Sequence, residues 1–397
     1  MRRMSAVITA VVISLSLTFL LAESLRAQSE AIDGSDLVAQ SKAAIRKGDV
    51  DTAISLLKRV VSQDPQSAEG NFLLGVVYLK LGQTGPAESL LLKAVALRPN
   101  YPEAYNNLGI LYDQRRQYDK STLAFLQALK LKPTDGNAAY NLGLSYLRQG
   151  KPNEALDTLT TLIDQNPLYS KAYLQAGIAQ SDLHHYPEAE KLLRKYVEFS
   201  SRDGDGYLEL GEVLYNETRY GEAIETFQRA AELNPQSSLA YSQLGYTYYN
   251  LGNFTEADTA LQKAVALDPK SVDANLYMGM LLTDKGDRQN ALGYLNKVVE
   301  LQPGNATAVY YQGYIAMLDG RLQEALVRLQ DSVQRKPDDA KTYYALALVC
   351  SRLGRTTESE EALKKFRELK AAQNNNGKGA AYLGPAPPSL HDSSTHP

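Results

Sequence analysis

Few residues in this sequence have the types and spacing that catalysis or metal binding requires. Cys350 is the only cysteine and has no histidine near it in the sequence, so it is expected to be a small buried hydrophobic residue. His184 and His185 are adjacent and lack a third ligand, which favours a solvated turn over a metal site. Residues 203–206 read Asp-Gly-Asp-Gly but lack the later acidic positions of a calcium loop, so a plain turn is expected. The sequence therefore predicts no enzyme, no metal site and no cofactor.

The elements that must position any functional residue are set by an internal period of 34 residues. A glycine recurs at this spacing, an alanine follows most of these glycines twelve residues later, and a proline follows most of them twenty-four residues later. A period of this length indicates a repeat architecture. The glycines are Gly75, Gly109, Gly143, Gly177, Gly211, Gly245, Gly279 and Gly313, the alanines include Ala87, Ala155, Ala223 and Ala325, and the prolines include Pro99, Pro133, Pro235 and Pro337.

Each 34-residue row contains two helical patterns. Residues 103–112 carry apolar side chains three and four positions apart, and the second pattern runs from about Tyr118 to Leu131. Pro133 ends the second helix, because proline lacks an N–H group and disfavours helix in the residue before it. Glycine inside a helix costs about 1 kcal/mol relative to alanine, so its recurrence predicts two helices that approach too closely for a Cβ atom.

At these residues the chain resembles the tetratricopeptide repeat family. The seventh repeat carries the family pattern at Tyr241, Leu244-Gly245, Tyr248, Ala257, Leu261, Ala264 and Pro269. The resemblance covers residues 34–373 and implies an all-α fold, a right-handed superhelix (solenoid) of about ten helix-turn-helix repeats. Ser41 and Ala347 replace the glycine in the first and last repeats, as suits capping units. Ser201 replaces the proline in the fifth repeat, which suggests a bend or hinge at the junction with the sixth.

The two ends of the chain differ from the repeats. Residues 1–27 have a basic start and an apolar stretch at 6–22, which is typical of a secretory signal and short for a membrane span. Cleavage after Ala27 and an uncleaved membrane anchor both remain open, and both place the repeats outside the cytoplasm. We expect a linker at 28–33, ten repeats at 34–373 and a disordered tail at 374–397. The expected location is the bacterial periplasm or cell envelope.

The composition narrows the class of partner. The net charge is -3 and 22% of the residues are charged, so neither sign dominates and neither nucleic acid nor an anionic membrane surface is indicated as a partner. Ten repeats also leave only short segments before and after them, and neither segment can form a catalytic domain. The sequence thus favours a non-catalytic scaffold that binds a protein or peptide partner.

The resemblance also implies which residues face the partner. Family members line a concave groove with their first helices, and one groove position carries a polar side chain in five successive repeats. Such a ladder can hydrogen-bond the backbone of an extended peptide. An exposed helix face that is simply polar explains it equally well. The ladder residues are Asn107, Asn141, Gln175, Glu209 and Gln243.

Tyrosines gather at the groove positions that the family implies in repeats six to ten. Tyrosine offers a large contact area at low entropic cost, as binding hot spots require. Interior packing of a tight superhelix is the alternative. The function expected is to bind an extended segment of a partner protein in envelope assembly; the alternative is to bind a carbohydrate polymer or small ligand within an envelope export machine. The predicted partner-binding tyrosines are Tyr246, Tyr249, Tyr277, Tyr310, Tyr311, Tyr314 and Tyr344, with Tyr140 and Tyr215 also at groove positions.

Overall fold

The computed structural model describes residues 34–375, and all of its 20 described helices are α-helices with no strand between them. The all-α prediction is therefore confirmed over this part of the chain. The predicted signal and linker, and residues 376–397 of the predicted tail, lie outside the described residues, whereas residues 374 and 375 of that tail are helical. None of the helices between residues 34 and 375 combines the length and the apolar character that crossing a bilayer requires.

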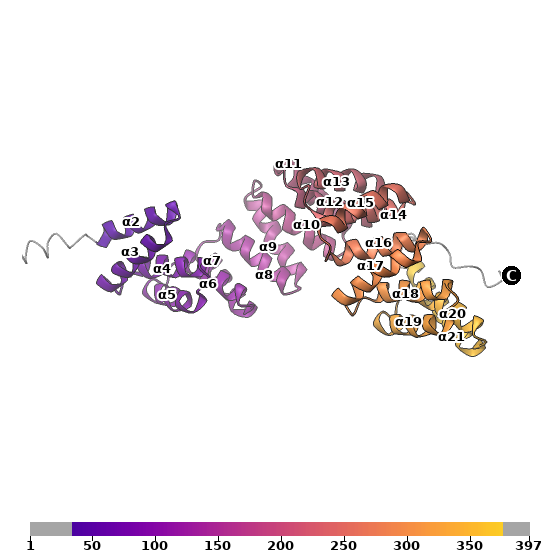
Figure 1. The fold of residues 1–397 in the computed structure, drawn as a ribbon. Coiled ribbons are helices and arrows are strands. Elements are labelled where there is room, and N and C mark those ends of the chain that lie inside the picture. Colours follow the sequence, from indigo (N-terminus) through magenta and orange to yellow (C-terminus); the bar gives the residue numbers. More distant parts are fainter. Residues whose placement is uncertain (1–33, 376–397) are drawn as a thin grey trace, which may run out of the picture. The chain divides into compact units, whose positions relative to one another are not determined.

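The chain divides into two compact units, and the boundary between them in the sequence follows Ala179 in helix α10 (Figure 1). Each unit is a stack of helix-turn-helix repeats, in which the even-numbered helix comes first and the odd-numbered helix second. Unit 1 contains α2 (Gly34–Lys47), α3 (Val50–Gln63), α4 (Ala68–Lys80), α5 (Thr84–Leu97), α6 (Pro102–Gln114), α7 (Tyr118–Leu131), α8 (Gly136–Arg148), α9 (Pro152–Gln165) and most of α10 (Ser170–Asp182). Unit 2 contains α11 (Tyr186–Phe199), α12 (Gly204–Asn216), α13 (Tyr220–Leu233), α14 (Ser238–Asn250), α15 (Phe254–Leu267), α16 (Val272–Asp284), α17 (Arg288–Leu301), α18 (Ala306–Leu318), α19 (Leu322–Arg335), α20 (Ala340–Arg352) and α21 (Thr356–Asn375).

The repeated glycines lie where the second helix of a repeat packs on the first. A Cβ atom at Gly109 would lie 2.5 Å from the ring of Phe125, and one at Gly245 would lie 2.6 Å from Leu261. Carbon atoms do not approach so closely without displacement, so a larger residue would push the second helix away. The prediction that these glycines allow close helix packing is confirmed.

Helix ends follow the local sequence. Ser237 caps α14, because its side chain accepts a hydrogen bond from the backbone N–H of Ala240. Asn305 caps α18 in the same way through the N–H of Ala308. Gly252 adopts a φ of +78° in the turn after α14, a conformation that glycine takes without strain. These signals set the length of each helix and thus which side chains face outward.

The junction of the fifth and sixth repeats is packed. The Tyr196 hydroxyl of α11 donates to the Asp203 carboxylate, which also caps α12 by accepting from the N–H of Asp205. Gly206 lies against the Tyr196 ring, which a Cβ atom would approach to 2.4 Å. The structure thus has a capped and filled junction at the place where the sequence suggests a bend or hinge, and the boundary between the two units lies earlier in the chain, within α10. The segment 203–206 thus forms the start of a helix.

Candidate partner-binding face

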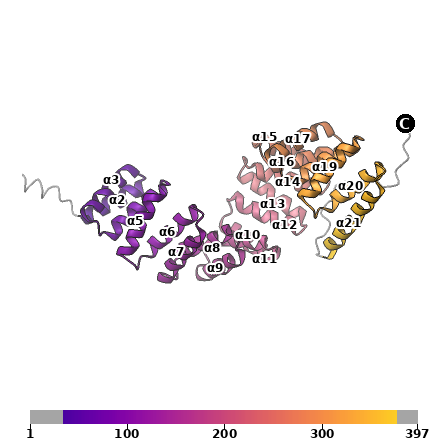
Figure 2. The same cartoon turned by 90° about the horizontal axis from the view of Figure 1, so that it is seen from below.

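The first helices of unit 2 contact one another in succession, from α12 through α14, α16 and α18 to α20. Helices α14 and α16 lie side by side in both ribbon views (Figure 2). Tyrosine rings from neighbouring first helices contact one another. The ring centre of Tyr246 on α14 lies 5.6 Å from that of Tyr215 on α12 and 4.1 Å from that of Tyr277 on α16. The planes of the Tyr246 and Tyr277 rings are inclined by 11°, so these two rings are stacked. We call the surface formed by these helices the tyrosine face. Its tyrosines are Tyr215, Tyr246, Tyr249, Tyr277, Tyr310, Tyr311, Tyr314 and Tyr344.

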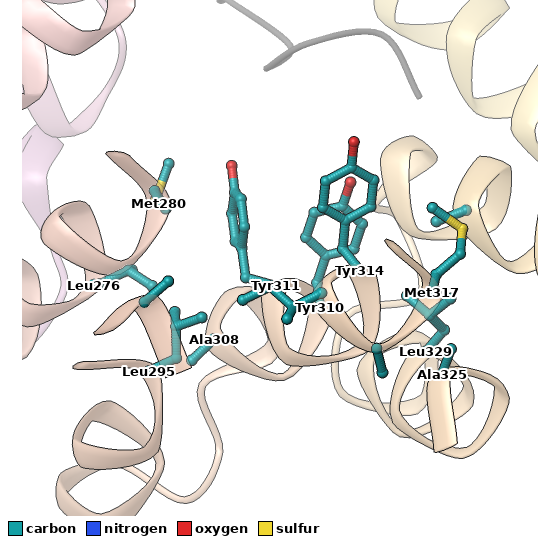
Figure 3. Packing of buried hydrophobic residues seen from close by; sticks show 14 of the residues in the cluster. Leu276, Met280, Leu295, Ala308, Tyr310, Tyr311, Tyr314, Met317, Ala325 and Leu329 are labelled. Carbon is teal, nitrogen blue, oxygen red and sulfur yellow. The ribbon is translucent and has the colours of Figure 1, made fainter. Parts of the chain in front are cut away.

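The tyrosines of this face are buried to different extents. Tyr249 is 1% exposed and belongs to the largest fully buried side chains of the described chain. On α18 the rings of Tyr310, Tyr311 and Tyr314 rise to the same side of the helix, with the hydroxyl groups farthest from it (Figure 3), and all three are buried. Tyr246 and Tyr277 are only partly buried. Interior packing, the alternative interpretation of the sequence, therefore applies to the buried rings, whereas Tyr246 and Tyr277 remain partly exposed.

Several hydroxyl groups are held by hydrogen bonds. The Tyr249 hydroxyl donates to Oδ2 of Asp284 at 2.5 Å, and Nδ2 of Asn250 donates to the Tyr215 hydroxyl at 3.0 Å. Burial is the main cause that raises the pKa of Tyr249 and Tyr277 far above the ordinary value. These phenols therefore stay protonated at neutral pH and act as neutral, rigid contact groups.

Carboxylates border the tyrosines. Burial, followed by the charges of Glu212, Asp182 and Asp205, raises the pKa of Glu209 to about 7. Burial likewise raises the pKa of Glu212, although a hydrogen bond from Gln243 (3.1 Å) acts in the opposite direction. These groups lie in a partly desolvated environment that disfavours their charged form.

Family models match most of the chain. Three models described as tetratricopeptide repeat match residues 19–67, 44–106 and 78–138. The model for anaphase-promoting complex, cyclosome, subunit 3 matches residues 114–196, and that for the cilia and flagella-associated protein 70 C-terminal domain matches residues 167–382, more than half of the chain. The chain belongs to the tetratricopeptide repeat family. Membership indicates a scaffold for protein–protein interaction.

Several solved structures are similar to parts of this chain. The Cut9–Hcn1 hetero-tetramer of the anaphase-promoting complex covers 86% of this chain and 95% of that chain at 15% identity and a TM-score of 0.50, which shows the fold alone. The pilF structure from Pseudomonas aeruginosa covers 52% of this chain and 94% of that chain, with 19% identity and a TM-score of 0.48. The structure of YrrB, described as a TPR protein with an unusual peptide-binding site, covers 48% of this chain and 98% of that chain, with 26% identity and a TM-score of 0.40. No curated protein sequence matches the chain significantly.

The polar ladder of this tetratricopeptide array is divided between the units. Asn107, Asn141 and Gln175 lie in unit 1, while Glu209 and Gln243 lie in unit 2, and all five side chains are partly buried. Three of the amides already donate within the chain. The donated hydrogen bonds run from Asn107 to the Glu103 carbonyl (2.8 Å), from Asn141 to Oδ1 of Asn106 (3.1 Å) and from Gln243 to Oε1 of Glu212 (3.1 Å).

The tetratricopeptide resemblance also implies groove positions that carry acidic residues, which the prediction of the site from the sequence did not include. Glu212, Asp273 and Asp284 occupy them, and the structure places Glu212 beside Gln243 and Asp284 beside Tyr249. A search of these positions for acidic as well as aromatic residues would have identified the three carboxylates from the sequence. The residues set aside have other roles: Cys350 is buried, while His184 bonds Tyr186 (2.9 Å) and His185 bonds Gln180 (2.9 Å).

Proposed function

We propose that this tetratricopeptide protein is a non-catalytic scaffold that holds an extended segment of a partner protein on the tyrosine face of unit 2. The observation that carries the proposal is the stack of Tyr246 on Tyr277, two partly exposed rings from neighbouring first helices. Their positions are held by packing against buried neighbours, so little side-chain entropy remains to be lost on binding. Rigid aromatic side chains of this kind carry much of the energy at protein interfaces.

Polar groups beside the rings suit the backbone of an extended segment. Gln243 donates one amide N–H to Glu212, and its amide keeps a second N–H and the carbonyl oxygen for an incoming peptide. The Glu209 side chain lies on the preceding first helix and is also partly exposed. Side chains of this type can bind a peptide backbone without selecting its sequence.

The proposed location is the bacterial periplasm or cell envelope, reached through the export signal at the N-terminus. The support is the basic start and the apolar stretch at 6–22. Sequencing the N-terminus of the protein purified from fractionated cells tests this. A mature chain that begins near residue 28 indicates a cleaved signal, an intact N-terminus in the membrane fraction indicates an anchor, and recovery from the cytoplasm contradicts export.

Affinity capture from an envelope extract tests the binding proposal. The variant with Tyr246→Ala and Tyr277→Ala should lose the partner, because replacing a hot-spot aromatic residue costs about 2 kcal/mol or more of binding energy. The matched control carries Tyr241→Ala and Tyr248→Ala on α14, the helix that also contains Tyr246. Both control residues line a separate recess of about 440 Å³ beside α15.

The control variant also distinguishes the tyrosine face from the recess beside α15 as the surface that binds the partner. Thermal unfolding of both double variants checks that each remains folded. Loss of the partner from the control but not from the Tyr246/Tyr277 variant moves the binding site to the recess. Binding of glycans by the purified protein, with no protein partner captured, favours the carbohydrate alternative and contradicts the proposal.

A further inference from the structure

The first helices of unit 2 have an uneven charge distribution. From α12 to α18 they contain five acidic residues and no lysine or arginine, although the whole chain is nearly balanced at a net charge of -3. Lysine and arginine return on α20, at Lys341 and Arg352. The acidic residues are Asp205, Glu209, Glu212, Asp273 and Asp284.

These five carboxylates lack cationic partners within residues 34–375, where none of them forms an ion pair with lysine, arginine or histidine. Several carboxylates on the second helices and turns of unit 2 do form ion pairs. Arg219 pairs with both Glu190 (2.7 Å) and Glu217 (2.9 Å). The first helices from α12 to α18 differ from these because they contain no lysine or arginine of their own that could form such pairs.

Burial makes the lack of partners energetically significant. Glu209, Glu212 and Asp284 are partly buried, and burial is the main cause that raises the pKa of each carboxyl group. Removing a charge from water without a nearby opposite charge is unfavourable. Lys341 lowers the pKa of Asp284 only through space, without an ion pair. Cationic side chains of a bound partner would reduce this cost of desolvation at several carboxylates at once.

The aromatic rings next to these carboxylates suit the same cations. After burial, the charges of Asp273 and Glu212 are among the causes that raise the pKa of Tyr277, and the charge of Asp284 acts in the same way on Tyr311 and Tyr314. A tyrosine ring attracts a lysine ammonium or an arginine guanidinium through its face. Arg288, the cation that acts on Tyr314 from α17, is already paired with Asp319 (2.9 Å).

We propose that the partner segment received by the tyrosine face carries lysine or arginine side chains, which pair with the unpaired carboxylates and lie against the tyrosine rings. This inference rests on the proposed function, since it specifies the chemistry of the segment that the same face binds. Charge complementarity would favour basic over acidic partner segments, because an acidic segment would be repelled by the carboxylates of α12 and α16.

Fluorescence anisotropy with three short labelled peptides tests the inference on the full-length protein. Each peptide alternates serine with lysine, glutamine or glutamate. The lysine peptide should bind at least about tenfold more tightly than the glutamine peptide, and the glutamate peptide should bind most weakly. Glu212→Gln with Asp273→Asn should reduce binding of the lysine peptide to the level of the glutamine peptide.

The matched control is Glu225→Gln with Glu256→Gln, which removes the same charge from the exposed second-helix surfaces of α13 and α15. This variant should bind the lysine peptide like the unmodified protein. Equal binding of the three peptides, no binding of the lysine peptide, or the same loss in both double variants would overturn the charge inference. None of these outcomes removes a partner captured through Tyr246 and Tyr277, so the proposed function stands or fails by its own experiment.

Discussion

The two units use one repeat for different surface chemistry. On the first helices of unit 1, Asp113 of α6 pairs with Arg148 of α8, and Glu69 of α4 pairs with Lys42 of α2 at 2.5 Å. On the first helices of unit 2, the carboxylates from α12 to α16 are unpaired and lie among tyrosines. The same packing period therefore carries two first-helix carboxylates in unit 1 that pair with basic residues of a neighbouring first helix, and five first-helix carboxylates in unit 2 that form no such pair.

The pKa shifts distinguish a paired carboxylate on the second helix α5 from an unpaired one on the first helix α12. In unit 1 the side-chain hydrogen bond from Arg115 acts against the effect of burial and lowers the pKa of Glu88. In unit 2 burial prevails and raises the pKa of Glu209 to about 7. A carboxylate with an internal partner stabilises the fold, whereas one without a partner is retained at some loss of stability. Functional sites commonly show perturbed groups of the second kind.

The largest expected difference between the units comes from one substitution made in both. Asp113→Asn breaks the ion pair with Arg148 in unit 1 and should destabilise α6 by about 1–2 kcal/mol, the lower part of the range of a charged hydrogen bond, because the Arg148 side chain is 54% exposed. Asp284→Asn removes an unpaired charge and keeps an oxygen that accepts from Tyr249, so α16 should change by less than about 0.5 kcal/mol or become more stable. Native-state hydrogen exchange of the amides in α6 and α16 measures both values. Equal destabilisation of the two helices would contradict the comparison.

A pH series should give opposite signs in the two units. Glu209 holds its proton in the folded state up to a pKa of about 7, against 4.5 for the unfolded chain, so its contribution makes stability fall as pH rises between these values. Glu88 has a lowered pKa, so its stabilisation is present above 4.5 and lost as pH falls below it. Melting temperatures of the unmodified protein, Glu209→Gln and Glu88→Gln, measured from below pH 4.5 to above pH 7, isolate each contribution. Binding of the lysine peptide should increase with pH as Glu209 ionises, and a profile unchanged by Glu209→Gln would exclude that role.

The sequence predicted the repeat and its helices because local signals repeat with the packing. Apolar residues at helical spacing and Pro133 place the second helix of the third repeat at 118–131, where the structure has α7. The contact of Gly109 with Phe125 follows from the same register. These features depend on residues close in sequence or one helix apart, so a single repeat contains the information.

Other features depend on neighbours that a single repeat does not contain. Tyr249 and Tyr277 both occupy groove positions, yet one is buried and the other partly exposed, because the adjoining repeats decide how closely each ring is covered. The Asp113–Arg148 pair joins residues 35 positions apart, and Glu212 meets Gln243 across 31 positions. The division after Ala179 leaves no break in the period at all. The predicted binding residues themselves remain a prediction.

The smallest expected effect comes from removing hydroxyl groups while keeping the rings. Tyr277→Phe in unit 2 and Tyr140→Phe in unit 1 should each change stability by less than about 0.5 kcal/mol, because both rings keep their aromatic neighbours, Tyr246 and Tyr169. If the ring faces attract the cation, Tyr277→Phe should also leave binding of the lysine peptide within about twofold, since phenylalanine offers a similar face. Tyr277→Ala should weaken that binding while Tyr140→Ala does not, as titration of the four variants with the labelled peptide would show. A strong loss in Tyr277→Phe would instead assign the contact to the hydroxyl group, and equal losses at Tyr140 and Tyr277 would remove the distinction between the two units.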